Sequence, residues 1–202
     1  METVAVAPAA AAAPARPALP IPDSIVPLRG LPIVGVVIAA LIVAIATNTP
    51  WALNFFHVAG GGAWTALDLF LGLILGPVIR SLAPPARAEF TARYMPKMLL
   101  IMPTLVTMTL GSGFQLARHF DFLNTAYPRH GYIVASMIVV GVMAVIALGV
   151  LQPAGVAVLF ELRKPQPNVE LIGRLMRRYM YSAGITGLLQ VATLVIMTRL
   201  PT

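Results

Sequence analysis

Five long apolar runs constrain the fold of this chain more than any other feature of its sequence. They lie at about residues 31–48, 51–80, 97–119, 131–160 and 171–198. A helix needs about 20 mostly apolar residues to cross the hydrocarbon core of a bilayer, and each run comes close to that length or exceeds it. Composition agrees, since 58% of the 202 residues are hydrophobic and only 10% are charged. The sequence therefore predicts an all-α, polytopic bundle of five membrane-spanning helices in a lipid bilayer.

The first 30 residues differ in composition from the rest. They hold the run APAAAAAPARPALPIPDSIVP, whose prolines disfavour a helix and whose alanines are too small to bury much area. We expect a non-helical tail over residues 1–30 and a transmembrane domain over residues 31–200. No basic start precedes an uninterrupted apolar stretch, so a cleaved signal peptide is not expected.

The basic residues predict how the chain is oriented. If the five runs alternate in direction, eleven of the 14 lysines and arginines fall on one side of the membrane, and only Arg118, Arg129 and Arg199 fall on the other. The side rich in basic residues is normally cytoplasmic. We therefore expect a multi-pass protein of the bacterial plasma membrane with a cytoplasmic N-terminus and a periplasmic C-terminus. Because these charges flank apolar spans, they suit anionic lipid rather than nucleic acid, despite the net charge of +7.

The second run, residues 51–80, carries the polar groups that suggest a function. At 3.6 residues per turn one of its faces collects Asn54, His57, Gly61, Thr65, Asp68, Gly72 and Gly76, while the other faces are almost wholly apolar. A histidine and a carboxylate on such a helix must turn away from lipid. That face is expected to look inward, toward other helices, a cofactor or a water-filled cavity.

His57 is the leading candidate for a ligand. It lies about two turns inside the second run and is followed by Gly60, Gly61 and Gly62, which leave room for a flat macrocycle or for a close helix. A haem iron commonly takes such a histidine as its axial ligand, and copper takes imidazole together with thioether. The alternative is that His57 hydrogen-bonds a neighbouring helix and that the glycines form a packing surface.

All three histidines fall on the periplasmic side in this topology. His119 ends the third run and is the candidate for a second axial ligand, and His130 precedes the fourth. Both stand beside an arginine near the headgroups, so the alternative is an ordinary interfacial side chain. The candidate metal ligands are therefore His57, His119, His130 and Met108, the last from the third run.

Asp68 lies 11 residues beyond His57, or about 16 Å further along the helix. No basic residue occurs in the central part of any run to neutralise it. It is expected to act in a proton relay or to be a structural acid, hydrogen-bonded by groups such as Thr104, Tyr181 or Ser182.

Several classes of site are excluded or disfavoured. The chain has no cysteine, so it cannot build a disulfide, a Cys-ligated zinc site or an iron–sulfur cluster by itself. It has no GxxxxGK[ST], GxGxxG or GxSxG motif, so nothing indicates a nucleotide-binding loop or a serine hydrolase. The sequence does not identify a reaction.

The motif FHVAGGGAW in the second run, followed by a basic loop and by PTLVTMTLGSGFQL in the third, resembles a group of small bacterial membrane proteins. That group includes the copper-resistance protein D family and the HemJ-type protoporphyrinogen oxidases. The resemblance covers about residues 51–120 and extends less clearly over 131–198. It implies the handling of haem, porphyrin or copper, with His57 as the matched residue and Trp64 beside it. The chain has no lysine deep in a span to match the one expected of the HemJ type.

Three functions follow as hypotheses. The first is binding or handling of b-type haem in a polar pocket near the periplasmic face, built from His57, Gly61 and Trp64 with His119 as the possible second ligand. The second is a cofactor-free accessory subunit of a larger membrane complex or homo-oligomer, and the third is copper uptake or handling.

Overall fold

The computed structural model describes residues 27–200, and within that range the chain forms helices and no β-strand. Five continuous helical stretches are long and apolar enough to cross a membrane, which confirms the predicted all-α architecture. The elements, in chain order, are η1 (Leu28–Gly30), α1 (Leu31–Ala46), α2 (Pro50–Leu69), η2 (Phe70–Leu75), α3 (Gly76–Ser81), α4 (Pro84–His119), α5 (His130–Ile146), η3 (Ala147–Leu151), α6 (Gln152–Leu162) and α7 (Val169–Met197). The predicted tail lies outside the described residues up to 26, and its last residues form the 3₁₀ turn η1.

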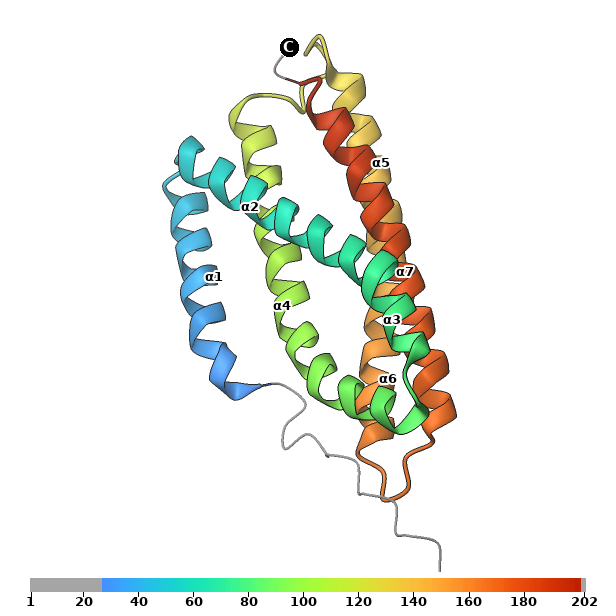
Figure 1. Ribbon diagram of the computed structural model, residues 1–202. Helices are drawn as coiled ribbons and strands as arrows, with labels where there is room; N and C mark the ends of the chain where they lie inside the picture. The colour runs from blue at the N-terminus through green and yellow to red at the C-terminus, as the bar shows by residue number, and fades with distance from the viewer. Residues whose placement is uncertain (1–26, 201–202) are drawn as a thin grey trace, which may run out of the picture.

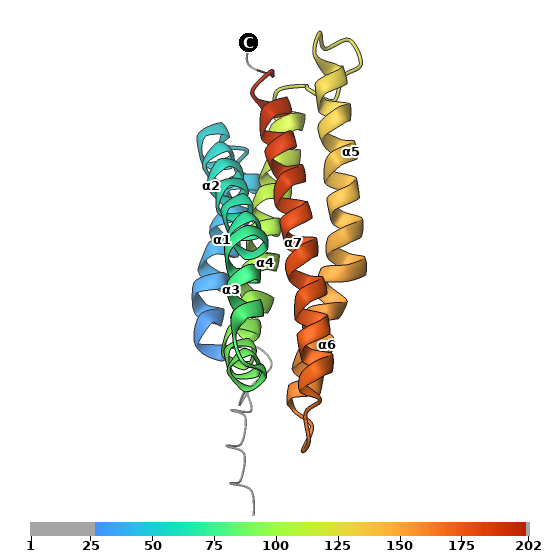
Figure 2. The same ribbon diagram turned by 45° about the vertical axis from the view of Figure 1, so that its right-hand side comes forward.

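The helix α7 stands at the centre of the bundle. It packs against α2, α4, α5 and α6, whereas α1 packs only on α4 and α2. Figure 2 shows α7 between a layer made of α1, α2, α3 and α4 and a second layer made of α5 and α6. The start of α1 and the end of α7 lie at opposite ends of the bundle (Figure 1), as an odd number of spans requires.

The two ends of the bundle are distinguished by their connections. We call the end with the turns at 82–83 and 163–168 the arginine end, and the end with the turns at 47–49 and 120–129 the histidine end. The third span begins earlier than predicted, at Pro84 instead of residue 97. Its first turns are helical although they are charged, because Arg93 and Glu89 form an ion pair of 2.7 Å one helical turn apart. A helix of 36 residues is about 54 Å long, so α4 extends beyond the hydrocarbon core.

The second and the fourth span each contain a π-helical segment close to a proline. Both segments end two residues before the proline: η2 ends at Leu75 before Pro77, and η3 ends at Leu151 before Pro153. A proline inside a helix lacks an N–H and collides with the carbonyl four residues earlier. The wider π turn relieves that conflict, so the helix continues through each of these two prolines.

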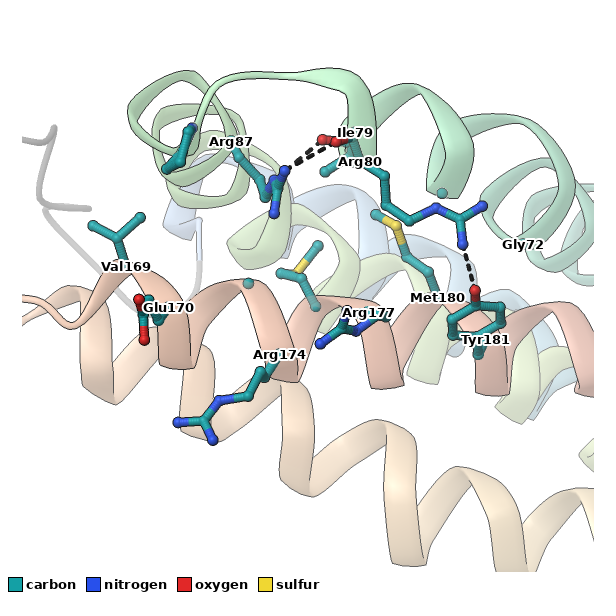
Figure 3. Close-up of a pocket in the computed structure, with 14 residues that line it drawn as sticks. Gly72, Ile79, Arg80, Arg87, Val169, Glu170, Arg174, Arg177, Met180 and Tyr181 are labelled. Carbon is teal, nitrogen blue, oxygen red and sulfur yellow. Dashed lines mark hydrogen bonds between the residues drawn. The ribbon is translucent and has the colours of Figure 1, made fainter.

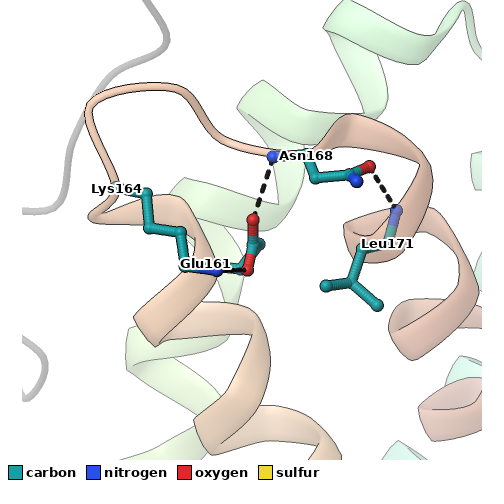
Figure 4. Close-up of polar contacts among 4 residues, drawn as sticks. All are labelled: Glu161, Lys164, Asn168 and Leu171. Carbon is teal, nitrogen blue, oxygen red and sulfur yellow. Dashed lines mark hydrogen bonds and ion pairs between the residues drawn. The ribbon is translucent and has the colours of Figure 1, made fainter.

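The turn between α6 and α7 is fastened by Glu161, which is buried at the end of α6 (Figure 4). Its Oε1 atom accepts a hydrogen bond of 3.0 Å from the backbone N–H of Asn168, and its Oε2 atom accepts one of 2.5 Å from Lys164. The side chain of Asn168 then caps α7 by accepting from the N–H of Leu171. This turn therefore fixes where α7 begins.

Candidate functional site

A large pocket opens at the histidine end, between α2, α4, α5 and the end of α7. Its volume is about 770 Å³. Its walls are mainly apolar side chains such as Phe114 and Ile133, and it is within the size range of cofactor pockets. The pocket has few polar members. Two of these, Thr109 and Ser136, donate their hydroxyl groups to carbonyls of their own helices, and a third polar member is His57.

The orientation of His57 is set by a hydrogen bond to the neighbouring helix. Its Nδ1 atom lies 2.8 Å from the backbone carbonyl oxygen of Thr109 on α4. A carbonyl can only accept, so Nδ1 is the protonated nitrogen, and in the neutral imidazole the lone pair resides on Nε2. Histidines that ligate metals are oriented in this way. The Nδ1–Cε1 edge of the ring lies against Gly113, where an added Cβ atom would come 2.5 Å from both atoms.

The glycines after His57 serve the packing of α2 on α4. A Cβ atom on Gly60 would lie 2.8 Å from the Thr109 hydroxyl oxygen and 3.0 Å from the Cβ atom of Met108, and one on Gly61 would lie 3.3 Å from the Thr109 methyl group. An added Cβ atom on Gly62 would meet nothing within 4 Å. Close helix packing therefore accounts for Gly60 and Gly61. Gly61, Met108 and Trp64 are not among the residues that line the pocket of His57.

The other two histidines are separate from this pocket. His119 is exposed, and its Nδ1 atom lies 2.8 Å from the side-chain nitrogen of Asn48 in the turn between α1 and α2. The oxygen of the same Asn48 amide accepts from Gln115, so its nitrogen must donate to His119 and occupies the lone pair of Nδ1. His130 is half-buried, with its Nδ1 atom 3.4 Å from the carbonyl oxygen of Phe122.

The structure therefore does not bring His57 and His119 together. Across residues 27–200 no group of three or more histidine, aspartate or glutamate side chains is placed to hold a metal ion. A site built from several such side chains is absent from this part of the chain, and His57 stands alone in its pocket.

Asp68 is fully buried and turns inward, as the sequence predicts for that face. Its Oδ2 atom accepts hydrogen bonds of 2.8 Å from the Thr186 hydroxyl and 2.9 Å from the side-chain nitrogen of Gln190. No lysine, arginine or histidine among the described residues lies within ion-pair distance of it. The expected partners Thr104, Tyr181 and Ser182 are wrong. The hydroxyl of Thr104 donates to a carbonyl of its own helix, and α7 presents to Asp68 the turns that follow Tyr181 and Ser182.

Three buried polar atoms near the middle of the bundle have no hydrogen-bond partner among the described residues. They are Oδ1 of Asp68, Oε1 of Gln190 and the hydroxyl of Tyr94. A cavity of about 40 Å³ reaches Thr186, which donates to Asp68, and is lined mainly by apolar side chains and by the π segment η3. None of the three unpaired atoms belongs to a residue that lines this cavity.

Comparisons of the chain with protein-family models, with characterised proteins and with solved structures found no match. The resemblance drawn from FHVAGGGAW stays a prediction, and the geometry of the sites is the basis for a functional assignment.

Proposed function

We propose that this chain is an integral membrane protein that binds b-type haem at the histidine end, with Nε2 of His57 as an axial ligand. One observation carries the proposal. The bond from His57 to the Thr109 carbonyl leaves Nε2 with a free lone pair at the wall of an apolar pocket of about 770 Å³. A haem requires one such nitrogen and a large apolar space.

Different residues of the pocket would contribute to holding the haem. Thr109 fixes the tautomer of His57 and the plane of its ring, and Gly113 leaves the room in which the ring lies. The apolar walls exclude water and favour a flat, membrane-soluble macrocycle. Bound haem would supply a redox-active iron. Two thioethers, Met137 and Met197, also line the pocket and are available as a second ligand in place of His119.

Copper is less well served by the same geometry. A copper ion requires several donor atoms converging within a small volume, whereas this pocket is wide and its one imidazole and two thioethers come from three different helical segments. The histidines that would complete a copper site are committed to Asn48 and to the Phe122 carbonyl.

The proposal is tested by absorbance spectra, oxidised and dithionite-reduced, of the protein purified in mild detergent. We expect a Soret band that shifts on reduction, disappears in His57→Ala and persists in the matched control His130→Ala. Elemental analysis of the same samples should find iron in a 1:1 ratio to porphyrin and no copper.

Two results would overturn it. One is a band that survives His57→Ala but not His119→Ala. The other is a preparation that stays colourless after haem is added, in which case co-purifying chains would favour the accessory-subunit hypothesis and bound copper the third.

The proposed location is the bacterial plasma membrane, with the arginine end in the cytoplasm. Because the chain has no cysteine, single cysteines can report the orientation. Thr125 is exposed at the histidine end and Gln166 is exposed at the arginine end, so Thr125→Cys and Gln166→Cys each place one reactive thiol there. We expect a membrane-impermeant maleimide to label the first in intact cells and the second only after permeabilisation. The reverse pattern would contradict this orientation.

A further inference from the structure

A second groove, independent of the His57 pocket, lies at the arginine end. It has a volume of about 570 Å³ and runs between α3 with the start of α4 on one side and the first half of α7 on the other. Figure 3 shows its lining residues. Four of them are arginines, Arg80, Arg87, Arg174 and Arg177, against one acid, Glu170.

Two of the four arginines form hydrogen bonds within the protein and two do not. Arg87 is held inside the protein, donating to the backbone carbonyls of Ile79, Arg80 and Leu82 at the end of α3. Arg80 donates to the hydroxyl of Tyr181 and lies over its ring, 5.3 Å from the centroid. These two contacts fix two guanidinium groups in place at the groove.

Arg174 and Arg177 are exposed and three residues apart on α7. Neither forms an ion pair or a side-chain hydrogen bond with any other described residue. Their ten N–H donors are therefore available, and guanidinium groups match phosphate oxygens in bidentate geometry. The groove therefore presents a surplus of positive charge, and we expect it at the level of the lipid phosphates because basic residues flank the ends of membrane spans.

The floor of the groove is apolar. It is formed by Gly76, Met176 and Met180, which are buried where α3 packs on α7. Gly76 lies four residues before Arg80, which is about 6 Å along a helix, so the charged and the apolar parts are continuous. A soluble anion would use only the charged part. A molecule with a phosphate head and a hydrocarbon tail would use both.

We propose that this groove binds an anionic phospholipid, with its phosphate on Arg174 and Arg177 and an acyl chain over the floor formed by Gly76 and Met180. The bound lipid bridges the second half of the second span to α7. It therefore stabilises the crossing next to Asp68, and it does so whether or not haem is bound at the other end.

The test uses the full-length protein, freed of lipid in detergent and returned to mixed micelles. We expect phosphatidylglycerol to raise the melting temperature by at least 5 °C, by an order-of-magnitude estimate from ligand-linked stabilisation, and phosphatidylcholine to leave it unchanged. In Arg174→Gln/Arg177→Gln we expect native mass spectrometry to show at least about tenfold weaker retention of phosphatidylglycerol, because two bidentate contacts are lost.

The matched control is Arg163→Gln/Arg178→Gln, which removes the same charge at the same end from residues that do not line the groove. It should bind phosphatidylglycerol as the unmodified protein does. Equal losses in both double variants would show general attraction to charge and overturn the site. If inorganic phosphate alone gave the whole stabilisation, with no further gain from phosphatidylglycerol, the ligand would be a soluble phosphate and the lipid assignment would be wrong.

Discussion

The same helices pack tightly at the arginine end and loosely at the histidine end. On the arginine side of Asp68 a continuous apolar core includes Leu71, Met95, Val158 and Met176. On the histidine side the corresponding core consists of Ala44, Leu53 and Leu116, and the pocket of His57 takes up the space beside it. The comparison shows that the arginine half is held together by a continuous core with its groove at the surface, whereas at the histidine half a pocket takes the place of much of that core.

Glycine accounts for much of this difference. A Cβ atom on Gly72 would lie 2.3 Å from the Cα atom of Gly184, and one on Gly187 would lie 3.0 Å from the backbone of Leu69. At these points the second span and α7 meet backbone to backbone, as small residues permit in membrane helices. At the histidine end Gly141 meets nothing within 4 Å, because α5 stands away from α4 there.

The largest effect is expected from Gly72→Leu. The new side chain would have to occupy the position of the α7 backbone, which cannot move without breaking the core of the arginine end. We expect most of the extracted protein to aggregate in size-exclusion chromatography. Gly35→Leu is the control, since a Cβ atom there meets nothing within 4 Å. A monodisperse Gly72→Leu protein would show that the crossing is not as close as described.

Asp68→Leu should have the next largest effect. It removes the acceptor of Thr186 and Gln190 and leaves the amide of Gln190 unsatisfied, at a cost of about 1–3 kcal/mol. Asp68→Asn keeps an oxygen for both donors and should cost clearly less. Thermal unfolding of the two variants in one detergent measures the difference. Equal losses in both would mean that the charge of the carboxylate, and not its acceptor, supports the fold.

The sequence predicted the features that depend on local pattern. The five spans follow from length and hydropathy, and the inward position of Asp68 follows from the helical period. It did not predict that Thr186 and Gln190 would be the partners, because the rotation of α7 depends on the contact of Gly72 with Gly184, 112 positions away. A signal was available, since Thr186 and Gln190 lie one turn apart and flank Gly187 in an apolar run.

Two further features could not be read from the sequence for different reasons. The charged residues at the start of α4 look like a loop in composition, although alternating charges one turn apart also suit a helix outside the membrane. The sequence offers both His57 and His119 as haem ligands. Only the positions of Asn48 and of the Thr109 carbonyl show that one ring has its Nδ1 lone pair occupied while the other has a free Nε2.

A smaller effect is expected at the turn that begins α7. Asn168→Ala removes the side-chain cap on the N–H of Leu171 and should cost about 1 kcal/mol. Asn168→Asp keeps an acceptor and should retain the stability. Hydrogen exchange at the first turn of α7 localises the change. Faster exchange spread over all of α7 would show that the arginine end is less rigid than its core indicates.

The smallest effect on stability is expected from Gly141→Leu, and this variant sharpens the comparison most. Gly141 lines the pocket and faces open space, so the added side chain displaces no neighbour. Leucine also favours a helix over glycine, and the free energy of unfolding should fall by no more than about 0.5 kcal/mol or should rise. The haem content should nevertheless drop severalfold, because the side chain takes up room that the ligand requires.

Gly131→Leu on the same helix is the control, since Gly131 meets nothing within 4 Å and does not line the pocket. Full haem content in Gly141→Leu would place the ligand elsewhere. A large loss of stability would show that the histidine end is packed after all, because a side chain destabilises only where there are neighbours for it to displace.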